Sequence, residues 1–286
     1  MSKLRIATIQ YKVDFIGNQE NYRNKICGII KEAAANNANI IVFPEYFSME
    51  LASLFAPEIY NSLNGQLAAL QEIYNDFLEL FSSQAVQNSV YILAGSYPVQ
   101  QKDGTYRNRA NFFSPDGKYD FQDKLQMTRF EKEKWLISPG SEIKTLDSEF
   151  GKIGINICYD SEFPLITRKQ TESGAKIILV PSCTDGLSGY NRVKIACQAR
   201  AMENQCFVVQ SALVGEADWS QAIDINIGSS AIFTPVDYGF PENGISAIGE
   251  LNRSQIVYAD IDLEQIDQVR NNGQVFNFHD WNKIIC

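Results

Sequence analysis

Hydrophobic residues follow two different spacings along the chain. Short runs that are continuously apolar, or that alternate with polar residues, are typical of strands, whereas apolar residues every three or four positions are typical of helices. Residues 39–44 (NIIVFP) form a continuous apolar run ending at a polar cluster, which predicts a strand buried on both faces. Strands are predicted at 4–11, 39–44, 90–96, 109–114, 119–124, 152–157, 176–181, 206–213, 228–234 and 255–261, and helices at 18–37, 66–87, 162–173 and 190–204.

The predicted strands and helices alternate without internal repeats. Residues 109–114 and 119–124 flank the turn Pro115-Asp116-Gly117 and predict a hairpin. No segment rich in glycine, serine or proline divides the 286 residues. We therefore predict one α/β domain over residues 1–286, with enough strands for two sheets.

The charge balance excludes several kinds of partner. Lysine and arginine number 25 against 34 aspartates and glutamates, a formal charge of −9. Nucleic acids and anionic membranes require a cationic surface, so neither is an expected partner. No apolar run approaches the ~18 residues of a membrane-spanning helix, and the first residues (MSKLRIATIQ) do not resemble a signal peptide. The six cysteines include no CxxC pair, which predicts reduced thiols and a cytoplasmic location.

The chain contains a single histidine, His279, in an irregular stretch near the C-terminus. Serine hydrolases of the usual kind and papain-like thiol enzymes require a histidine base, and histidine-rich zinc sites require two or three such side chains. We interpret His279 as a surface or packing residue. Any proton transfer in an enzyme of this composition then falls to carboxylates, lysine or cysteine.

Three predicted strands end at residues with reactive side chains. Glu45 follows IIVFP, Lys124 follows YDFQD, and Cys158 follows GKIGINI. Taken singly, each has an ordinary explanation: an exposed cap, a solvated lysine, a small core residue. Because active sites of α/β folds gather at the carboxyl ends of strands, the three together indicate a common site.

The segments around these residues resemble the three signature blocks of the nitrilase superfamily, the carbon–nitrogen hydrolases. The blocks are IIVFPEYF, DKLQMTRFEKEKW and GINICYDSEFP, in the order and at spacings compatible with that family. Residues 189–194, 199–205 and 228–235 extend the resemblance over nearly the whole chain. The resemblance implies a four-layer α-β-β-α sandwich, in which two mixed sheets face one another and helices lie outside.

The resemblance also implies catalytic roles. Cys158 is the nucleophile that attacks an amide or nitrile carbon to give a thioester or thioimidate. Glu45 is the base that takes the thiol proton and returns it to the leaving nitrogen. Lys124 stays protonated and stabilises the oxyanion together with the backbone N–H of Tyr159. A second glutamate is expected after the lysine: Glu131 fits best.

Two choices among similar residues stay open at this point. Glu133 is the rival of Glu131, because EKEKW offers two acids. Cys183 also follows a buried strand, but it lacks the acidic, turn-forming context of Cys158, and we interpret it as part of the pocket wall.

The remaining contacts are implied more weakly. The resemblance places Tyr46, Tyr159, Cys183 and Thr184 around the substrate. Arg192 and Glu203 lie on the predicted helix 190–204, where we interpret them as members of buried charge pairs.

The sequence therefore predicts a hydrolase of non-peptide C–N bonds, an amidase before a nitrilase. An N-carbamoyl-amide hydrolase and a catalytically idle binding or assembly protein are the alternatives. The expected partner is a small amide or nitrile, with no metal and no organic cofactor, because side chains and backbone supply every catalytic group. The family's habit of dimerising through helices implies a homodimer or higher homo-oligomer, with helices 162–173 and 190–204 at the interface.

Overall fold

Strand β1 (Lys3–Lys12) belongs to both halves of the structure, a computed structural model that describes residues 2–281. Its first eight residues pair antiparallel with β14 (Gln255–Asp262), and residues 6–8 pair parallel with β2 (Ile40–Val42) on the other side. Its last two residues pair parallel with β10 (Phe207–Glu216). One sheet of 14 strands thus curls into two facing layers joined at β1.

The first layer continues from β2 to β3 (Tyr91–Leu93) and β5 (Tyr106–Phe113), with β4 (Tyr97–Gln100) and β6 (Tyr119–Asp123) paired to β5. The second layer contains the other strands: β7 (Thr145–Ser148), β8 (Gly151–Ile155), β9 (Ile177–Ser182), β10, β11 (Ile225–Asn226), β12 (Ala231–Phe233) and β13 (Ile245–Ile248).

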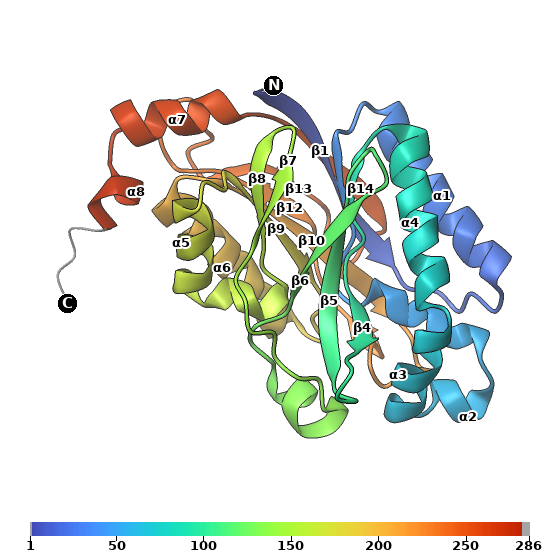
Figure 1. Ribbon diagram of the computed structural model, residues 1–286. Helices are drawn as coiled ribbons and strands as arrows, with labels where there is room; N and C mark the ends of the chain where they lie inside the picture. The colour runs from blue at the N-terminus through green and yellow to red at the C-terminus, as the bar shows by residue number, and fades with distance from the viewer. Residues whose placement is uncertain (1, 282–286) are drawn as a thin grey trace.

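Helices cover the outer face of each layer (Figure 1). Helices α1 (Gln19–Ala35) and α4 (Tyr74–Asn88) lie over the first layer, and α5 (Pro164–Glu172) and α6 (Leu187–Asn204) lie over the second. The remaining helices are α2 (Pro57–Tyr60), α3 (Leu63–Glu72), α7 (Leu263–Asn272), α8 (Asn277–Asp280) and the short turns η1 (Phe47–Leu54), η2 (Glu131–Trp135) and η3 (Cys158–Glu162).

Alternation along β2 explains the four layers. Ile41 packs in a cluster with Ile26 of α1 and Phe81 of α4, whereas Ile40 and Val42 pack against the strands of the second layer. A parallel strand between two neighbours is apolar on both faces for this reason. The prediction of an α-β-β-α sandwich is confirmed; that of a single domain over residues 1–286 stays a prediction.

Two helix predictions were wrong in detail. The helix predicted at 66–87 is two helices, α3 and α4, which meet at Ile73. The helix predicted from Glu162 begins at Pro164, because residues 158–162 form the separate turn η3. Strands β4, β7, β11 and β13 and helices α7 and α8 were not predicted.

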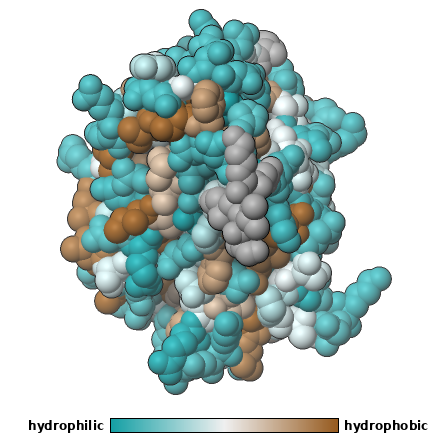
Figure 2. All heavy atoms as spheres, turned by 90° about the vertical axis from the view of Figure 1, so that its left-hand side faces the viewer, coloured by the Kyte–Doolittle hydropathy of each residue, from teal (hydrophilic) through white to brown (hydrophobic). Residues whose placement is uncertain are grey.

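The face that carries α5 and α6 exposes apolar side chains among polar ones (Figure 2). Leu165 and Ile195 are 63% and 65% exposed. His279 lies on α8 and is exposed, as predicted, whereas Cys286 lies outside the described residues. Within residues 2–281, no helix is long and apolar enough to cross a membrane.

Candidate active site

Four strands direct residues into one cavity of about 520 Å³. Glu45 follows β2, Lys124 follows β6, and Cys183 follows β9. Cys158 comes three residues after β8. All eight residues that the sequence suggested for the site line this cavity: Glu45, Tyr46, Lys124, Glu131, Cys158, Tyr159, Cys183 and Thr184. Their catalytic and binding roles stay predictions.

The centre of the site is a buried ion-pair network. The Nζ of Lys124 lies 2.7 Å from Oε1 of Glu45 and 2.8 Å from both carboxylate oxygens of Glu131. Lys124 and Glu45 are 1% exposed and Glu131 is 2% exposed. Glu133 instead lies at the surface and pairs with Arg129. The structure thus places Glu131, and not its rival, beside the lysine.

Neighbouring donors hold the two carboxylates in place. The hydroxyl of Tyr46 donates to Oε1 of Glu131 at 2.8 Å, and the backbone N–H of Cys183 donates to Oε2 of Glu45 at 3.0 Å. Thr128 donates to Glu131 from both its backbone N–H and its hydroxyl. Each buried oxygen of the two glutamates therefore has a partner, as buried charge requires.

Asn108 was missed by the sequence analysis. Its Nδ2 donates to Glu45 at 2.9 Å and to Glu131 at 3.4 Å, so a single amide bridges both carboxylates. Its backbone carbonyl accepts a hydrogen bond from the backbone N–H of Lys124. Asn108 directly precedes the predicted strand 109–114, but nothing in the sequence around it indicates a contact with Glu45 or Glu131.

The loop after β2 is held by the loop after β3. Tyr46 has a left-handed backbone (φ 55°), and its N–H donates to the hydroxyl of Ser96. Gly95 (φ +49°) faces this loop so closely that a Cβ there would lie 2.0 Å from the carbonyl oxygen of Pro44. Only glycine fits, and this close packing fixes the direction in which Glu45 leaves β2.

Cys158 has a left-handed backbone, with φ of 48°. Such a conformation costs a non-glycine residue about 1–3 kcal/mol, and the surrounding structure must enforce it. Asp160 supplies part of that constraint, because its carboxylate accepts hydrogen bonds from the backbone N–H groups of Leu125, Gln126 and Ile157. Asp160 thus ties the turn of Cys158 to the loop of Lys124. Burial raises the pKa of Asp160 to about 7, against the opposing effect of Lys124 and these donors.

The electrostatics of the cluster separate its two glutamates. Burial raises the pKa of Glu45, and Lys124 only partly offsets that effect. Burial acts on Glu131 in the same direction, but Lys124 and the hydrogen bonds outweigh it and lower the pKa. Burial lowers the pKa of Lys124, yet the two carboxylates raise it well above its usual value, so the ammonium stays charged.

Burial and the charge of Glu45 raise the pKa of the Cys158 thiol well above its usual value. The thiol is therefore protonated at neutral pH, and a nearby base must remove the proton before the sulfur can attack. The Sγ of Cys158 lies 3.6 Å from the carbonyl oxygen of Cys183.

The cavity also contains residues with other expected roles. The hydroxyl of Thr184 donates to the carbonyl of Ile227, so it already has an acceptor within the protein. Arg192 is not the buried charge partner that we predicted: its side chain is 61% exposed and lines the cavity. Glu203 does form a largely buried pair, 2.8 Å from Arg200. Within residues 2–281, no group of three or more His, Cys, Asp or Glu side chains is arranged to hold a metal ion.

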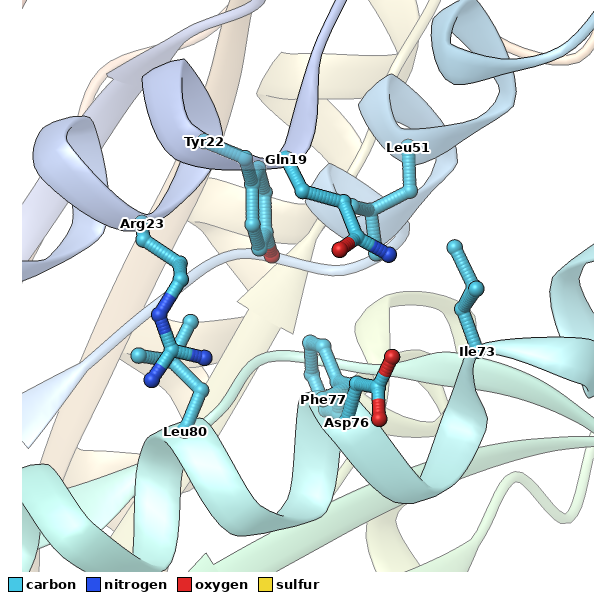
Figure 3. A pocket seen from close by; sticks show the side chains of 8 residues that line it. All are labelled: Gln19, Tyr22, Arg23, Leu51, Ile73, Asp76, Phe77 and Leu80. Atoms are coloured by element: carbon cyan, nitrogen blue, oxygen red, sulfur yellow. The ribbon is translucent and has the colours of Figure 1, made fainter.

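A second cavity, of about 60 Å³, lies between α1 and α4 and away from these residues (Figure 3). Gln19, Tyr22 and Arg23 from α1 face Asp76, Phe77 and Leu80 from α4 across it. The residues that line this cavity and those that line the larger one are entirely different.

Known proteins resemble this chain over most of its length. Probable hydrolase YhcX of Bacillus subtilis is 38% identical over 277 residues, which cover 97% of this chain and 53% of that protein, so the chain spans about half of that relative. Omega-amidase NIT2 of Homo sapiens is 26% identical over 286 residues, covering 96% of this chain and 95% of that one.

The fold also matches a solved structure, the carbon-nitrogen hydrolase from Helicobacter pylori G27. The TM-score is 0.79 at 20% identity, covering 94% of this chain and 92% of that one. The model of the family described as "Carbon-nitrogen hydrolase" matches residues 5–271. Because this match covers nearly the whole chain, the protein belongs to the carbon–nitrogen hydrolase family.

Proposed function

We propose that this protein hydrolyses the C–N bond of small primary amides, with Cys158 as nucleophile, Glu45 as base and Lys124 as the cationic stabiliser. The observation that carries the proposal is the shared cavity: a protonated thiol, a carboxylate of raised pKa and a charged lysine lie together there. Relatives that are named omega-amidases support the choice of amides.

In the proposed first half-reaction, Glu45 takes the thiol proton as the sulfur of Cys158 bonds to the amide carbon. The carbonyl oxygen becomes negative, and Lys124 with the backbone N–H of Tyr159 stabilises that charge. Glu45 then returns its proton to the nitrogen as the C–N bond breaks, which releases ammonia and leaves a thioester on Cys158.

In the second half-reaction, Glu45 takes a proton from water, whose oxygen attacks the thioester carbon. The C–S bond then breaks and the carboxylic acid leaves. Glu45 gives its proton to the sulfur of Cys158, which restores both groups. Glu131 acts as a positioning residue in this scheme, because it holds Lys124 with both carboxylate oxygens and also accepts from Tyr46.

The test is an ammonia-release assay over short aliphatic, aromatic, dicarboxylic ω-amide, nitrile and carbamoyl compounds. We expect turnover of amides, loss of at least 10³-fold in the Cys158→Ala variant, and an acyl adduct on Cys158 in the mass spectrum of the quenched enzyme. As a control, Cys183→Ala keeps turnover. Full activity of the Cys158→Ala variant contradicts the mechanism. If the enzyme turns over only nitriles or only carbamoyl compounds, that class and not amides is the substrate.

A catalytically idle protein is the alternative from another class. Labelling with iodoacetamide at neutral pH separates the two: the proposal requires stoichiometric modification of Cys158, assisted by Glu45. An unreactive Cys158 favours the idle protein. We also propose a cytoplasmic location, which is supported by cysteine usage in the sequence, and a homodimer.

A further inference from the structure

We propose that the substrate amide carries a cationic group at its far end. This inference rests on the proposed function, because it concerns the same cavity. It starts from the charged residues that line the cavity and are partly or largely exposed, which we term the entrance residues: Arg129, Glu162, Asp185, Arg192 and Asp224.

Each of the two entrance arginines already lies beside a carboxylate. Arg129 lies 2.7 Å from Glu133, outside the cavity lining, and its side chain is 88% exposed. Arg192 points toward Glu162, with 3.4 Å between its Nε and the carboxylate. Each guanidinium thus already has a carboxylate beside it, and both side chains are largely surrounded by water, which weakens their pull on a ligand.

Against the two arginines, three carboxylates line the entrance of the cavity: Glu162, Asp185 and Asp224. Among the described residues, neither Asp185 nor Asp224 lies within 4.0 Å of a cationic side chain. Deeper in the cavity, Glu45 and Glu131 share the single charge of Lys124. The outer end of a ligand in the cavity therefore lies near two carboxylates, Asp185 and Asp224, that have no cationic partner among the described residues, and these attract a cation and repel a carboxylate.

The aromatic side chains that line the cavity also favour a cationic ligand. Tyr46, Phe130, Trp135 and Tyr159 all line it, and the faces of aromatic rings attract cations. The indole N–H of Trp135, whose side chain is 1% exposed, has no hydrogen-bond partner within residues 2–281.

Three amides of equal chain length test the proposal by kcat/KM for ammonia release: 5-aminopentanamide (cationic), pentanamide (neutral) and glutaramate (anionic). We expect the cationic amide to exceed the anionic one by at least 10-fold, with the ratio falling as salt rises. The double variant Asp185→Asn, Asp224→Asn should lower kcat/KM for the cationic amide at least 3-fold and leave pentanamide unchanged. The double variant Asp147→Asn, Glu149→Gln, at two exposed positions in and directly after β7, is the charge-matched control.

A second measurement does not depend on turnover. The alkylation rates of Cys158 by iodoacetamide and iodoacetate, followed by mass spectrometry, give a ratio that is compared with the ratio for N-acetylcysteine. We expect the anionic reagent to be disfavoured at Cys158 by a further factor of 10 or more, and the double variant to shrink that factor.

The outcomes separate the two proposals. An alkylation ratio equal to that of the free thiol, or a glutaramate kcat/KM equal to or above that of 5-aminopentanamide, overturns the cationic substrate. If alkylation of Cys158 depends on the charge of the reagent but no amide releases ammonia, the proposed amidase activity is wrong and the charge preference of the cavity stands. Equal loss on all three amides in the double variant shows a structural effect and also counts against the inference.

Discussion

At the scale of single residues, the neighbours of Glu45 decide which of its oxygens is available to a proton. Oε1 accepts hydrogen bonds from Lys124 and Asn108, whereas Oε2 accepts one from the N–H of Cys183. A carboxylate oxygen has two lone pairs, so Oε2 keeps capacity for one further donor. We infer that Oε2 is the atom that exchanges protons with the thiol of Cys158.

The raised pKa of Glu45 predicts the acid limb of the pH profile. The base works only when ionised, so kcat/KM should rise with pH through the pKa of Glu45 in the folded protein. Because burial raises that pKa, the midpoint of the limb should lie above the ordinary value of 4.5. The measurement is kcat/KM against pH for a neutral amide, and a midpoint at or below 4.5 contradicts this assignment of the base.

Asn108 should matter through the two carboxylates that it bridges. Asn108→Leu removes the donor to both and should lower kcat by about 10–100-fold with little change in KM, since Asn108 does not line the cavity. It should also move the acid limb to higher pH, because Glu45 loses a donor to its ionised form. The kcat–KM split and the shifted limb are the readouts. If thermal melts show a loss of folded protein that accounts for the lost activity, and the acid limb of the pH profile does not move, Asn108 has only a structural role.

The sequence indicated the reactive residues but not the residues whose hydrogen bonds hold them in position. Glu45, Lys124 and Cys158 each follow a recognisable strand, so local patterns sufficed to suggest them. Asn108 reaches Glu45 across 63 positions, and Asp160 reaches Leu125 across 35. Such partners depend on how strands are ordered in space, which no local pattern reports.

At the scale of elements, the predicted alternation of strands and helices agreed with the four layers, and the errors have identifiable causes. Residues 66–87 contain no glycine or proline, so nothing in the pattern signals the break at Ile73, which ends α3 and precedes α4. Strand β13 at the sheet edge alternates only between half-buried and exposed positions and lacks an apolar run. The position of β13 depends on the assembled layers, which bring it beside β12.

Two tyrosines near α1 provide a matched pair at this scale. The hydroxyl of Tyr11 donates to the buried carboxylate of Glu50, whereas that of Tyr22, beside the small cavity of Figure 3, has no partner among the described residues. Tyr11→Phe should lower the free energy of unfolding by about 1.5–3 kcal/mol, because a charged acceptor loses its donor. Tyr22→Phe should leave it unchanged or raise it. Urea titrations measure both, and an equal cost for the two substitutions would refute the distinction.

At the scale of the whole molecule, the α5–α6 face is the proposed dimer interface. Leu165, Ile195 and Met202 are 63%, 65% and 42% exposed there, and apolar side chains that cluster on one face favour association. Ile195→Glu should convert the dimer to monomer in sedimentation velocity runs. Val86→Glu, at a 49% exposed position of α4, serves as the control and should stay dimeric. A monomeric wild-type protein, or a dimeric Ile195→Glu variant, rules out this interface.

The double pairing of β1 has a consequence for how the protein is made. Lys3 at the start of β1 pairs with Asp262 at the end of β14, so β1 leaves the ribosome long before the strand that covers its edge. Contacts between such distant positions slow folding. Every residue proposed for catalysis is synthesised well before β14, yet the layer that carries Glu45 is complete only after synthesis passes residue 262. Until then β1 is an uncovered strand edge, the kind of surface on which nascent chains aggregate, and chaperones should increase the yield of folded protein.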